Sequence, residues 1–154
     1  MAVLNWGKPL IEICELEADG SMPSVPNWVA LPTPAEGTTQ MNTTEGEKTE
    51  AKEEGGGIVD SKQLKSTYAL VFALFEKGTK PIPDTDGIVT KNYALRLTPQ
   101  DTQLNGFLMK KCSVGYQYTW TAADGGRWVY TFTALVPNDN TAMLQSYKAG
   151  DAIS

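Results

Sequence analysis

Two segments near the end of the chain alternate between apolar and polar side chains with a period of two residues. Residues 107–121 place apolar and aromatic side chains on one side of an extended chain: Cys112, Val114, Tyr116, Tyr118 and Trp120. Residues 127–136 do the same with Trp128, Tyr130, Phe132, Ala134 and Val136. Residues 122–126 between them have the composition of a hairpin loop of about five residues. The pattern predicts a long antiparallel hairpin, which restricts the chain to sheet-based folds.

Four further segments have strand character: residues 8–16, 28–31, 64–76 and 88–97. Residues 8–16 and 64–76 carry hydrophobic side chains on both sides, which is typical of strands covered on both faces. Residues 28–31 lie between prolines, a setting that predicts a short edge strand. Residues 100–105 and 142–148 compete as the place of a short helix. We expect one mainly-β domain over residues 1–154, a β-sandwich or β-barrel of about six to eight strands with one or two short helices.

A polar stretch over residues 38–60 interrupts this pattern. It is rich in threonine and glutamate, lacks aromatic residues and contains three consecutive glycines at 55–57. Such a stretch is either a disordered loop or an arm that becomes ordered against a partner. We favour an arm, folded as an exposed hairpin with residues 45–47 near its tip and the glycines as a hinge or bulge. A helix over residues 48–54 is the rival interpretation. The assigned arm residues are Thr43, Thr44, Glu45, Glu47, Glu50, Glu53, Glu54, Gly55 and Gly56.

The composition excludes several catalytic classes. The chain has no histidine, which removes Ser-His-Asp and Cys-His catalysis and histidine-based metal sites. Cys14 and Cys112 are far apart in apolar, alternating contexts. We interpret them as small buried hydrophobes in preference to a disulfide or a reactive thiol. We therefore expect no catalytic residues, no metal and no cofactor, and we expect that the protein is not an enzyme.

The charge and hydropathy of the chain limit its partners. A net charge of −5 and a pI near 4.7 argue against a surface that neutralises nucleic-acid phosphates. A function that requires DNA to be repelled stays compatible with this charge. The N-terminus lacks the pattern of a secretory signal, and no apolar run approaches the roughly 20 residues of a membrane helix. We expect a cytoplasmic protein with no membrane contact.

Two further groups of residues are weaker candidates for binding. Residues 84–87, Asp-Thr-Asp-Gly, begin like a calcium loop but lack its spacing and its terminal glutamate, so a turn is the simpler interpretation. Four aromatic residues of the predicted hairpin are candidates for a surface that binds a sugar or a partner, with core packing as the alternative. They are Tyr118, Trp120, Trp128 and Tyr130.

The order of these features resembles the tail tube proteins of long-tailed bacteriophages, which share a fold with the tube protein of type VI secretion. The resemblance rests on a short N-terminal strand (IEICEL), a tryptophan-bearing connection (PNWVALPTPAEG), a polar arm (TTEGEKTEAKEEGG), a hydrophobic strand (STYALVFALF) and a closing hairpin that ends GGRWVYTFTALVP. It spans most of the chain but contains no invariant motif.

The resemblance implies a β-barrel or sandwich with a flanking helix, assembled into homo-hexameric rings that stack into a hollow tube. It also implies that the long loop contacts neighbouring subunits or rings, that other phage tail proteins are partners, and that DNA passes through as a non-specific passenger. The protein would occupy the bacterial cytoplasm during assembly and then the virion tail. The alternative is a monomeric β-sandwich module that binds a ligand, such as a carbohydrate, through the aromatic hairpin.

Overall fold

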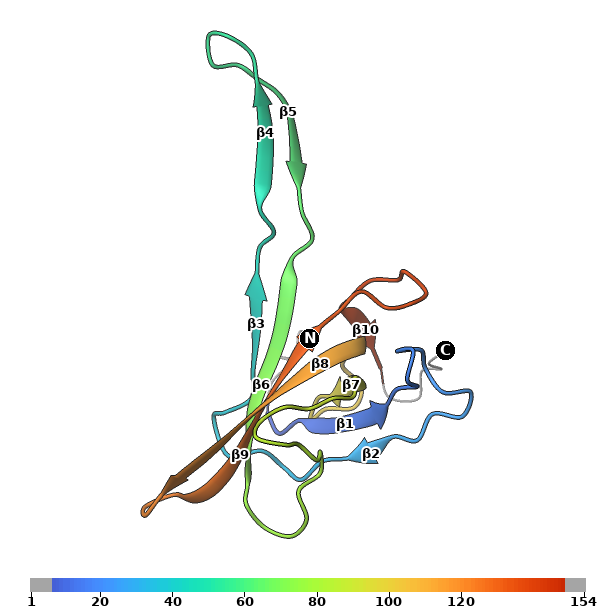
Figure 1. The fold of residues 1–154 in the computed structure, drawn as a ribbon, viewed down its shortest axis with the longest axis vertical. Coiled ribbons are helices and arrows are strands. Elements are labelled where there is room, and N and C mark those ends of the chain that lie inside the picture. Colours follow the sequence, from blue (N-terminus) through green and yellow to red (C-terminus); the bar gives the residue numbers. More distant parts are fainter. Residues whose placement is uncertain (1–6, 149–154) are drawn as a thin grey trace.

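A computed structural model describes residues 7–148, and this part of the chain contains ten β-strands and no helix (Figure 1). The strands are β1 (Leu10–Glu15), β2 (Val29–Ala30), β3 (Gln40–Thr44), β4 (Lys48–Lys52), β5 (Ile58–Gln63), β6 (Thr67–Phe75), β7 (Tyr93–Thr98), β8 (Gly106–Thr121), β9 (Gly125–Ala134) and β10 (Gln145–Tyr147). The predicted mainly-β, sandwich-like fold is confirmed. The described residues contain more strands than expected and lack the expected short helices.

Eight strands form one antiparallel sheet in the order β2-β1-β7-β8-β9-β6-β3, with β10 attached to β8. The long strand β8 connects the two halves, because it pairs with β7 near its start and with β9 over the rest of its length. The predicted hairpin is β8–β9, paired from Cys112 and Ala134 out to Thr121 and Gly125. Its loop holds three residues, shorter than the expected five, because Gly125 adopts a φ of +75° and closes the turn early.

The core lies on one face of this curved sheet. Strands β1, β6, β7, β8 and β9 all contribute buried side chains to a single cluster, so the sheet curls round its own apolar face. Phe72 and Phe132 stack with ring centroids 5.6 Å apart at the centre of the cluster. Tyr130 donates a hydrogen bond from its hydroxyl to the Ile82 carbonyl at 3.3 Å, which secures the loop after β6 over the core.

A smaller cluster covers the outer face of β1 and β7. Cys14, Leu16 and Ala94 are buried there beneath Met22 and Trp28 of the connection that precedes β2. The prediction that the first strand is covered on both sides is therefore confirmed. Strand β6 is covered less completely, because the face opposite the core ends in Phe75, whose side chain is 42% exposed.

Both predicted helices are wrong. Residues 101–104 form a turn, in which the Asp101 carboxylate accepts a hydrogen bond from the Gln103 backbone N–H at 3.0 Å. Within residues 142–148 the chain is instead extended as β10, paired with the start of β8. Pairing satisfies its backbone groups and buries Tyr147, and a short isolated helix offers neither advantage. The strand predicted over residues 88–97 begins only at Tyr93.

Candidate functional site

The polar stretch forms a two-stranded ribbon that projects from the body of the molecule (Figure 1). The chain leaves the sheet along β3, runs outward as β4, returns as β5 and rejoins the sheet as β6. Strands β4 and β5 form a sheet of their own, separate from the eight-stranded one. We call residues 45–66 the arm. The predicted exposed hairpin is confirmed, and the rival helix over residues 48–54 is wrong, because residues 48–52 form strand β4 and the chain turns after them.

The arm joins the body where its outgoing and returning segments pass close to each other. The Leu64 N–H donates to the Glu47 carbonyl at 2.9 Å. At Gly46 a Cβ atom would lie only 1.9 Å from the Leu64 carbonyl oxygen. Only glycine leaves room for this approach, so Gly46 sets the geometry with which the arm leaves the sheet.

The tip of the arm lies at residues 53–57, which corrects the predicted tip at residues 45–47. Gly55 and Gly56 adopt φ values of +93° and +89°. The Glu53 N–H donates to the Gly57 carbonyl at 2.9 Å and closes the turn. The glycines therefore make the turn itself instead of a hinge at its base, because two consecutive residues here need the left-handed backbone region.

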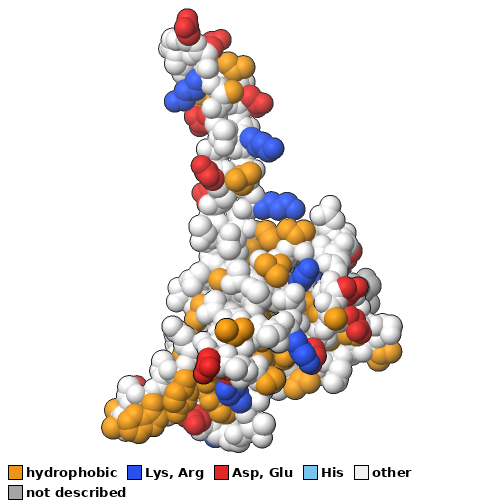
Figure 2. All heavy atoms as spheres, in the orientation of Figure 1, with side chains coloured by type: hydrophobic (Ala, Val, Ile, Leu, Met, Phe, Trp, Pro, Cys, Tyr) orange, Lys and Arg blue, Asp and Glu red, His pale blue; other side chains and the backbone are white. Residues whose placement is uncertain are grey.

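Every residue of β4 and β5 is exposed to solvent. Residues 45–63 carry six carboxylates and three lysines, and charged side chains are distributed along the arm in Figure 2. Apolar side chains are exposed as well: Ile58 at 59%, Val59 at 65% and Leu64 at 52%. The arm thus combines an acidic character with apolar residues that have no cover in the single chain.

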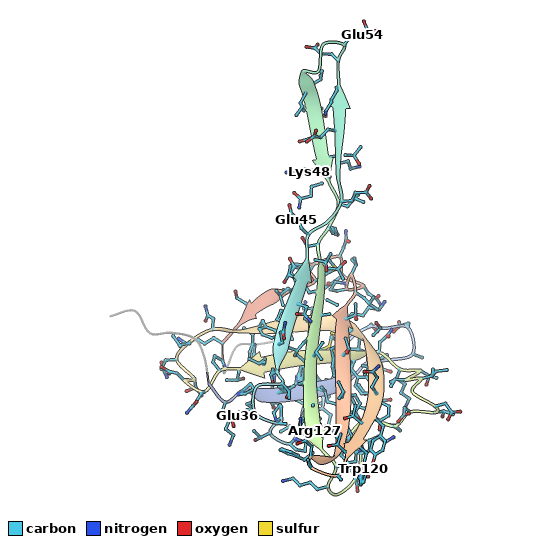
Figure 3. All side chains as sticks on the ribbon, turned by 90° about the vertical axis from the view of Figure 1, so that its left-hand side faces the viewer. Glu36, Glu45, Lys48, Glu54, Trp120 and Arg127 are labelled. Carbon is cyan, nitrogen blue, oxygen red and sulfur yellow. The ribbon has the colours of Figure 1, made fainter. Side chains whose placement is uncertain are left out.

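The structure divides the predicted arm residues among three places. Thr43 and Thr44 belong to β3 and are part of the main sheet. Glu45 lies at the base of the arm and accepts a hydrogen bond from Gln63, and Glu47 and Glu50 lie along its outgoing side. Glu53, Glu54, Gly55 and Gly56 form the tip, and Figure 3 shows Glu54 at the far end.

The structure also divides the four candidate aromatic residues. Trp128 is 6% exposed and Tyr130 is fully buried, so both belong to the core. Tyr118 and Trp120 are 51% and 65% exposed, near the end of the β8–β9 hairpin. Figure 3 places Trp120 at the opposite end of the molecule from the arm tip. Only Tyr118 and Trp120 are therefore available to a ligand or partner.

One neighbour of this hairpin end was missed by the sequence interpretation. Phe75, the last residue of β6, is half-exposed, and the Arg127 guanidinium lies 5.4 Å from its ring centroid. The Tyr118 hydroxyl donates a hydrogen bond to the Glu76 carboxylate, which raises the pKa of Tyr118. The register β6–β9, which pairs Phe75 with Arg127, could not be read from residues 64–76 alone. We call Tyr118 and Trp120 the aromatic tip; by the strand register, Phe75 and Arg127 lie on the opposite face of the sheet.

The described residues contain no cluster of metal-ligand side chains. No three carboxylates or thiols gather there in a way that would hold a metal ion. Asp84, in the calcium-like sequence, instead pairs with Lys80 and accepts the Gly87 N–H at 2.9 Å, and these contacts lower the pKa of Asp84. The turn interpretation of this segment is confirmed.

The two cysteines are free thiols buried on opposite faces of the sheet. Cys112 belongs to the main core and Cys14 to the smaller outer cluster. Burial raises the pKa of both thiols. Their predicted role as small buried hydrophobes is confirmed. Residues 7–148 also contain no helix that could span a membrane.

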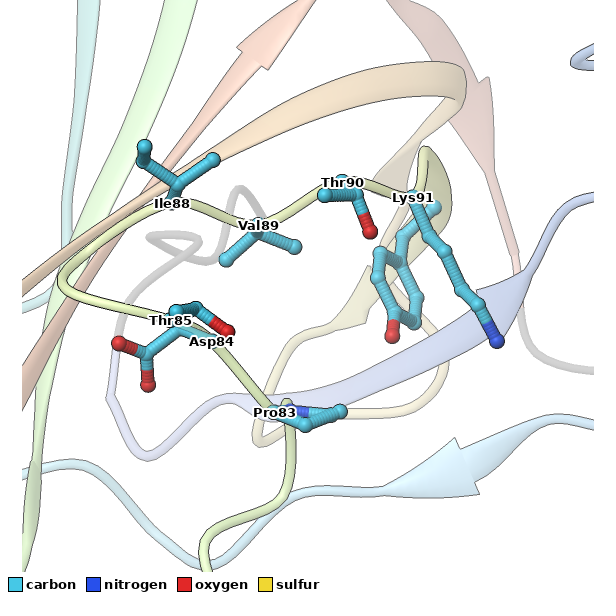
Figure 4. Close-up of a pocket in the computed structure, with 8 residues that line it drawn as sticks. Pro83, Asp84, Thr85, Ile88, Val89, Thr90 and Lys91 are labelled. Atoms are coloured by element: carbon cyan, nitrogen blue, oxygen red, sulfur yellow. The ribbon is translucent and has the colours of Figure 1, made fainter.

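A hollow in the surface lies between the proline-rich loops. A cavity of about 410 Å³ is lined by Pro23, Val25, Val29, Pro81, Pro83 and Tyr93, with Glu15 and Lys91 at its polar side. We call it the proline pocket. Pro83, Lys91 and Tyr93 also border a neighbouring cavity of about 150 Å³, whose other wall is the loop of residues 84–90 (Figure 4).

In comparisons with known proteins, no protein-family model and no curated protein sequence matches the chain.

Proposed function

We propose that this chain is a structural subunit of a phage tail tube, which assembles with copies of itself into stacked rings around a DNA-conducting channel. The observation that carries the proposal is the arm. A ribbon of two strands, with every side chain exposed, projects from a well-packed body. The order of features in the sequence, which resembles that of tail tube proteins, supports the same conclusion.

An isolated two-stranded ribbon is marginally stable in water, because it buries too little apolar surface. Both outer edges of β4–β5 have unpaired backbone groups, and such edges associate with other chains unless they are protected. Ile58 and Val59 add apolar area that a neighbouring subunit would remove from water. A permanent contact with another subunit would pair these edges, bury this apolar area and so stabilise the ribbon.

The acidic charge supports a channel that DNA crosses without binding. The chain carries a net charge of −5, and carboxylates outnumber lysines along the arm. Such a surface repels phosphates, so DNA gains no binding free energy there from the release of its counterions. In the proposed assembly, DNA is a passenger and the stable partners are other copies of the chain and neighbouring tail proteins.

Removal of the arm tests the proposal directly. Thr44 and Thr67 pair in the register of β3 and β6, so residues 45–66 can be replaced by Asn-Gly, the preferred two-residue hairpin turn. We expect this variant to fold and to stay monomeric in size-exclusion chromatography with light scattering. The unaltered protein should form rings or tubes in negative-stain microscopy at high concentration.

The double variant Glu53→Gln with Glu54→Gln is the matched control. It keeps the length and turn of the arm and changes only the charge of its tip. We expect it to assemble. Assembly by the arm-deleted variant would contradict the role of the arm, and an unaltered protein that stays monomeric at every concentration would contradict the proposed function.

The exposed pair Tyr118 and Trp120 favours a second candidate, a monomeric module that binds carbohydrate. Aromatic rings stack on sugar faces, and the nearby Glu76 carboxylate could accept hydrogen bonds from sugar hydroxyls. A glycan array distinguishes the candidates. Binding that is lost in Trp120→Ala, from a protein that stays monomeric, would favour the module.

A further inference from the structure

Strand β5 has a free edge on the outside of the arm. Strands β4 and β5 form a sheet of two strands, so each has one edge without a neighbour. All side chains of β5 are exposed, and Figure 1 shows the strand clear of the body on its way back to β6. A free edge of this kind is a template for another strand, and the register of the arm decides which groups it presents.

The backbone groups of β5 alternate between β4 and the free edge. The Leu64 N–H donates to the Glu47 carbonyl at 2.9 Å, so Leu64 directs its backbone groups toward β4. In an antiparallel pair this direction alternates from residue to residue, so Lys62 and Asp60 also face β4. The free edge presents the backbone groups of the residues between them, Ser61 and Gln63.

Val59 lengthens this edge by one residue. The register of the arm passes from Asp60 directly to Ile58, so Val59 lies in a bulge without a partner in β4. Its side chain is 65% exposed. The free edge of β5 therefore covers residues 59–63, with Ser61 at its centre.

The side chains on either side of Ser61 have opposite charges. Asp60 and Lys62 lie on the same face of β5, because they are two residues apart. When two copies of the strand pair antiparallel with Ser61 opposite Ser61, each Asp60 lies opposite the Lys62 of the other copy. These are non-hydrogen-bonded positions, where opposite side chains come closest, with Cα atoms about 4.5 Å apart. Opposite charges at such positions stabilise the pairing of two strands.

A shifted register loses this match. The backbone groups at the edge repeat every two residues, so the pairing shifts in steps of two. One step in either direction brings Asp60 opposite Asp60 or Lys62 opposite Lys62. Like charges directly opposite each other destabilise a sheet. The charges therefore select the register that is centred on Ser61.

The edge of β4 lacks this property. Its outward backbone groups belong to the residues that alternate with those facing β5: Lys48, Glu50 and Lys52. Pairing of two copies along the whole of β4, centred on Glu50, brings Glu50 opposite Glu50 and Lys48 opposite Lys52. Repulsion of like charges therefore protects the edge of β4, whereas the edge of β5 attracts its own copy.

We propose that two copies of this chain associate through the free edges of β5, paired antiparallel with Ser61 on a two-fold axis. The partner is a second copy because the edge matches its own sequence in charge and in backbone spacing. The contact joins two ribbons into one sheet of four strands, which is more stable than a sheet of two. Val59 comes opposite Gln63 of the second copy and loses exposed apolar area.

This contact goes beyond the proposed tube and does not depend on it. A two-fold contact uses the same surface on both copies and ends at two copies, whereas a ring is built from two different surfaces. The dimer is therefore a form of the free chain, present before any ring assembles. It covers an edge that otherwise associates without control.

Exchange of the two charges tests the contact. Asp60→Lys alone and Lys62→Asp alone each place like charges at both cross-strand positions. We expect each to raise the dissociation constant of the dimer by about tenfold or more. A one-to-one mixture of the two variants restores both opposite pairs and should form a heterodimer. The double variant exchanges the charges within one chain and should dimerise like the unaltered protein. Sedimentation velocity measures these masses.

A backbone variant separates the pairing of the edge from its charge. Ser61→Pro removes the N–H that points to the free edge and removes no hydrogen bond to β4, a change that edge strands tolerate. It should be monomeric. Ser61→Ala keeps the N–H and should dimerise. Lys52→Asp makes the same change of charge as Lys62→Asp, but on β4, and should dimerise as well. Hydrogen exchange of the core strands should be the same in all variants.

The amide protons of Ser61 and Gln63 give an independent measure, because they point to the free edge. They should exchange slowly in the dimer and quickly after dilution. A protein that is monomeric until rings form would make the inference wrong and leave the proposed function standing, as would Asp60→Lys and Ser61→Pro variants that dimerise normally. The described dimer without rings at any concentration would support the inference and contradict the proposed function. A protein that is monomeric at every concentration contradicts both.

Discussion

The Arg96 guanidinium binds the Glu12 carboxylate through two parallel hydrogen bonds, Nε to Oε1 and Nη2 to Oε2, each 3.0 Å long. The two residues are direct partners in the register of β1 and β7. Trp28 and Tyr147 both lie over the guanidinium, with ring centroids 4.4 Å and 5.4 Å from Cζ. One side chain therefore connects β7 with β1, with the connection before β2 and with β10.

We expect Arg96→Lys to destabilise the fold, because lysine keeps the charge but loses the planar fork and its stacking on the two rings. Hydrogen bonds to charged groups contribute about 1.5–3 kcal/mol, and both side chains are only 18% exposed. The urea midpoint should fall accordingly. Lys91→Ala removes a comparable but exposed pair with Glu15 and should move the midpoint much less. Equal shifts in the two variants would contradict the role assigned to Arg96.

Gly46→Ala should disturb the junction of arm and body. The added Cβ would lie 1.9 Å from the Leu64 carbonyl, so one of the two chains must move, at a cost of about 1–3 kcal/mol. Hydrogen exchange of residues 47–64 should quicken while the core stays protected. Gly115→Ala is the control, since its Cβ meets Thr131 at an ordinary 3.8 Å. That variant should be neutral or slightly stabilising, and slower exchange in Gly46→Ala would count against the close approach of the two segments.

The stability of the fold should depend on pH through Asp139. The Thr141 hydroxyl and the Lys110 ammonium donate hydrogen bonds to this carboxylate and lower the pKa of Asp139 from its ordinary 3.8 to about 2. A carboxyl group whose pKa is lower in the folded state stabilises the fold above its unfolded pKa and loses this effect as the pH falls through the folded value. Asp139→Asn should therefore reduce the loss of stability between about pH 4 and pH 2, measured by urea unfolding at each pH. An unchanged profile would show that the contact contributes nothing.

Both thiols should be unreactive in the folded protein. Cys14 and Cys112 are 1% and 0% exposed, and burial raises the pKa of each, so little thiolate is accessible at neutral pH. An aromatic disulfide reagent should modify neither thiol under native conditions and both in denaturant. Rapid reaction of one thiol in the native state would place that cysteine at the surface and contradict its position in the sheet.

The expected arrangement was most accurate where local pattern alone decides the structure. The alternation over residues 107–136 predicted β8 and β9, and flanking prolines predicted the edge strand β2. The pattern predicts the arm as a hairpin but places its tip at residues 45–47 and not at residues 53–57, because both glycine-containing segments have turn chemistry. The pairing of β4 with β5 places the turn at the second of these segments, residues 53–57.

The helix predicted over residues 142–148 is wrong for a different reason. Their composition suits a short helix, yet they form β10, because an unpaired stretch of β8 offers backbone partners that a local pattern cannot reveal. Phe75 shows the same limit. Its place beside Arg127, on the opposite face of the sheet from the aromatic tip, follows from the pairing of β6 with β9, which lie more than fifty residues apart in the chain.

The sequence by itself determined that this chain is mainly β, that it has a polar arm and that its cysteines are buried, because side-chain periodicity and composition are properties of the chain alone. Only the tertiary structure decided which aromatic residues are exposed. Tyr118, Trp120, Trp128 and Tyr130 share one alternating pattern, but the core and the loop at Ile82 cover Trp128 and Tyr130 and leave the other two in solvent. Burial depends on what distant segments place above a strand, and no period within the strand encodes that.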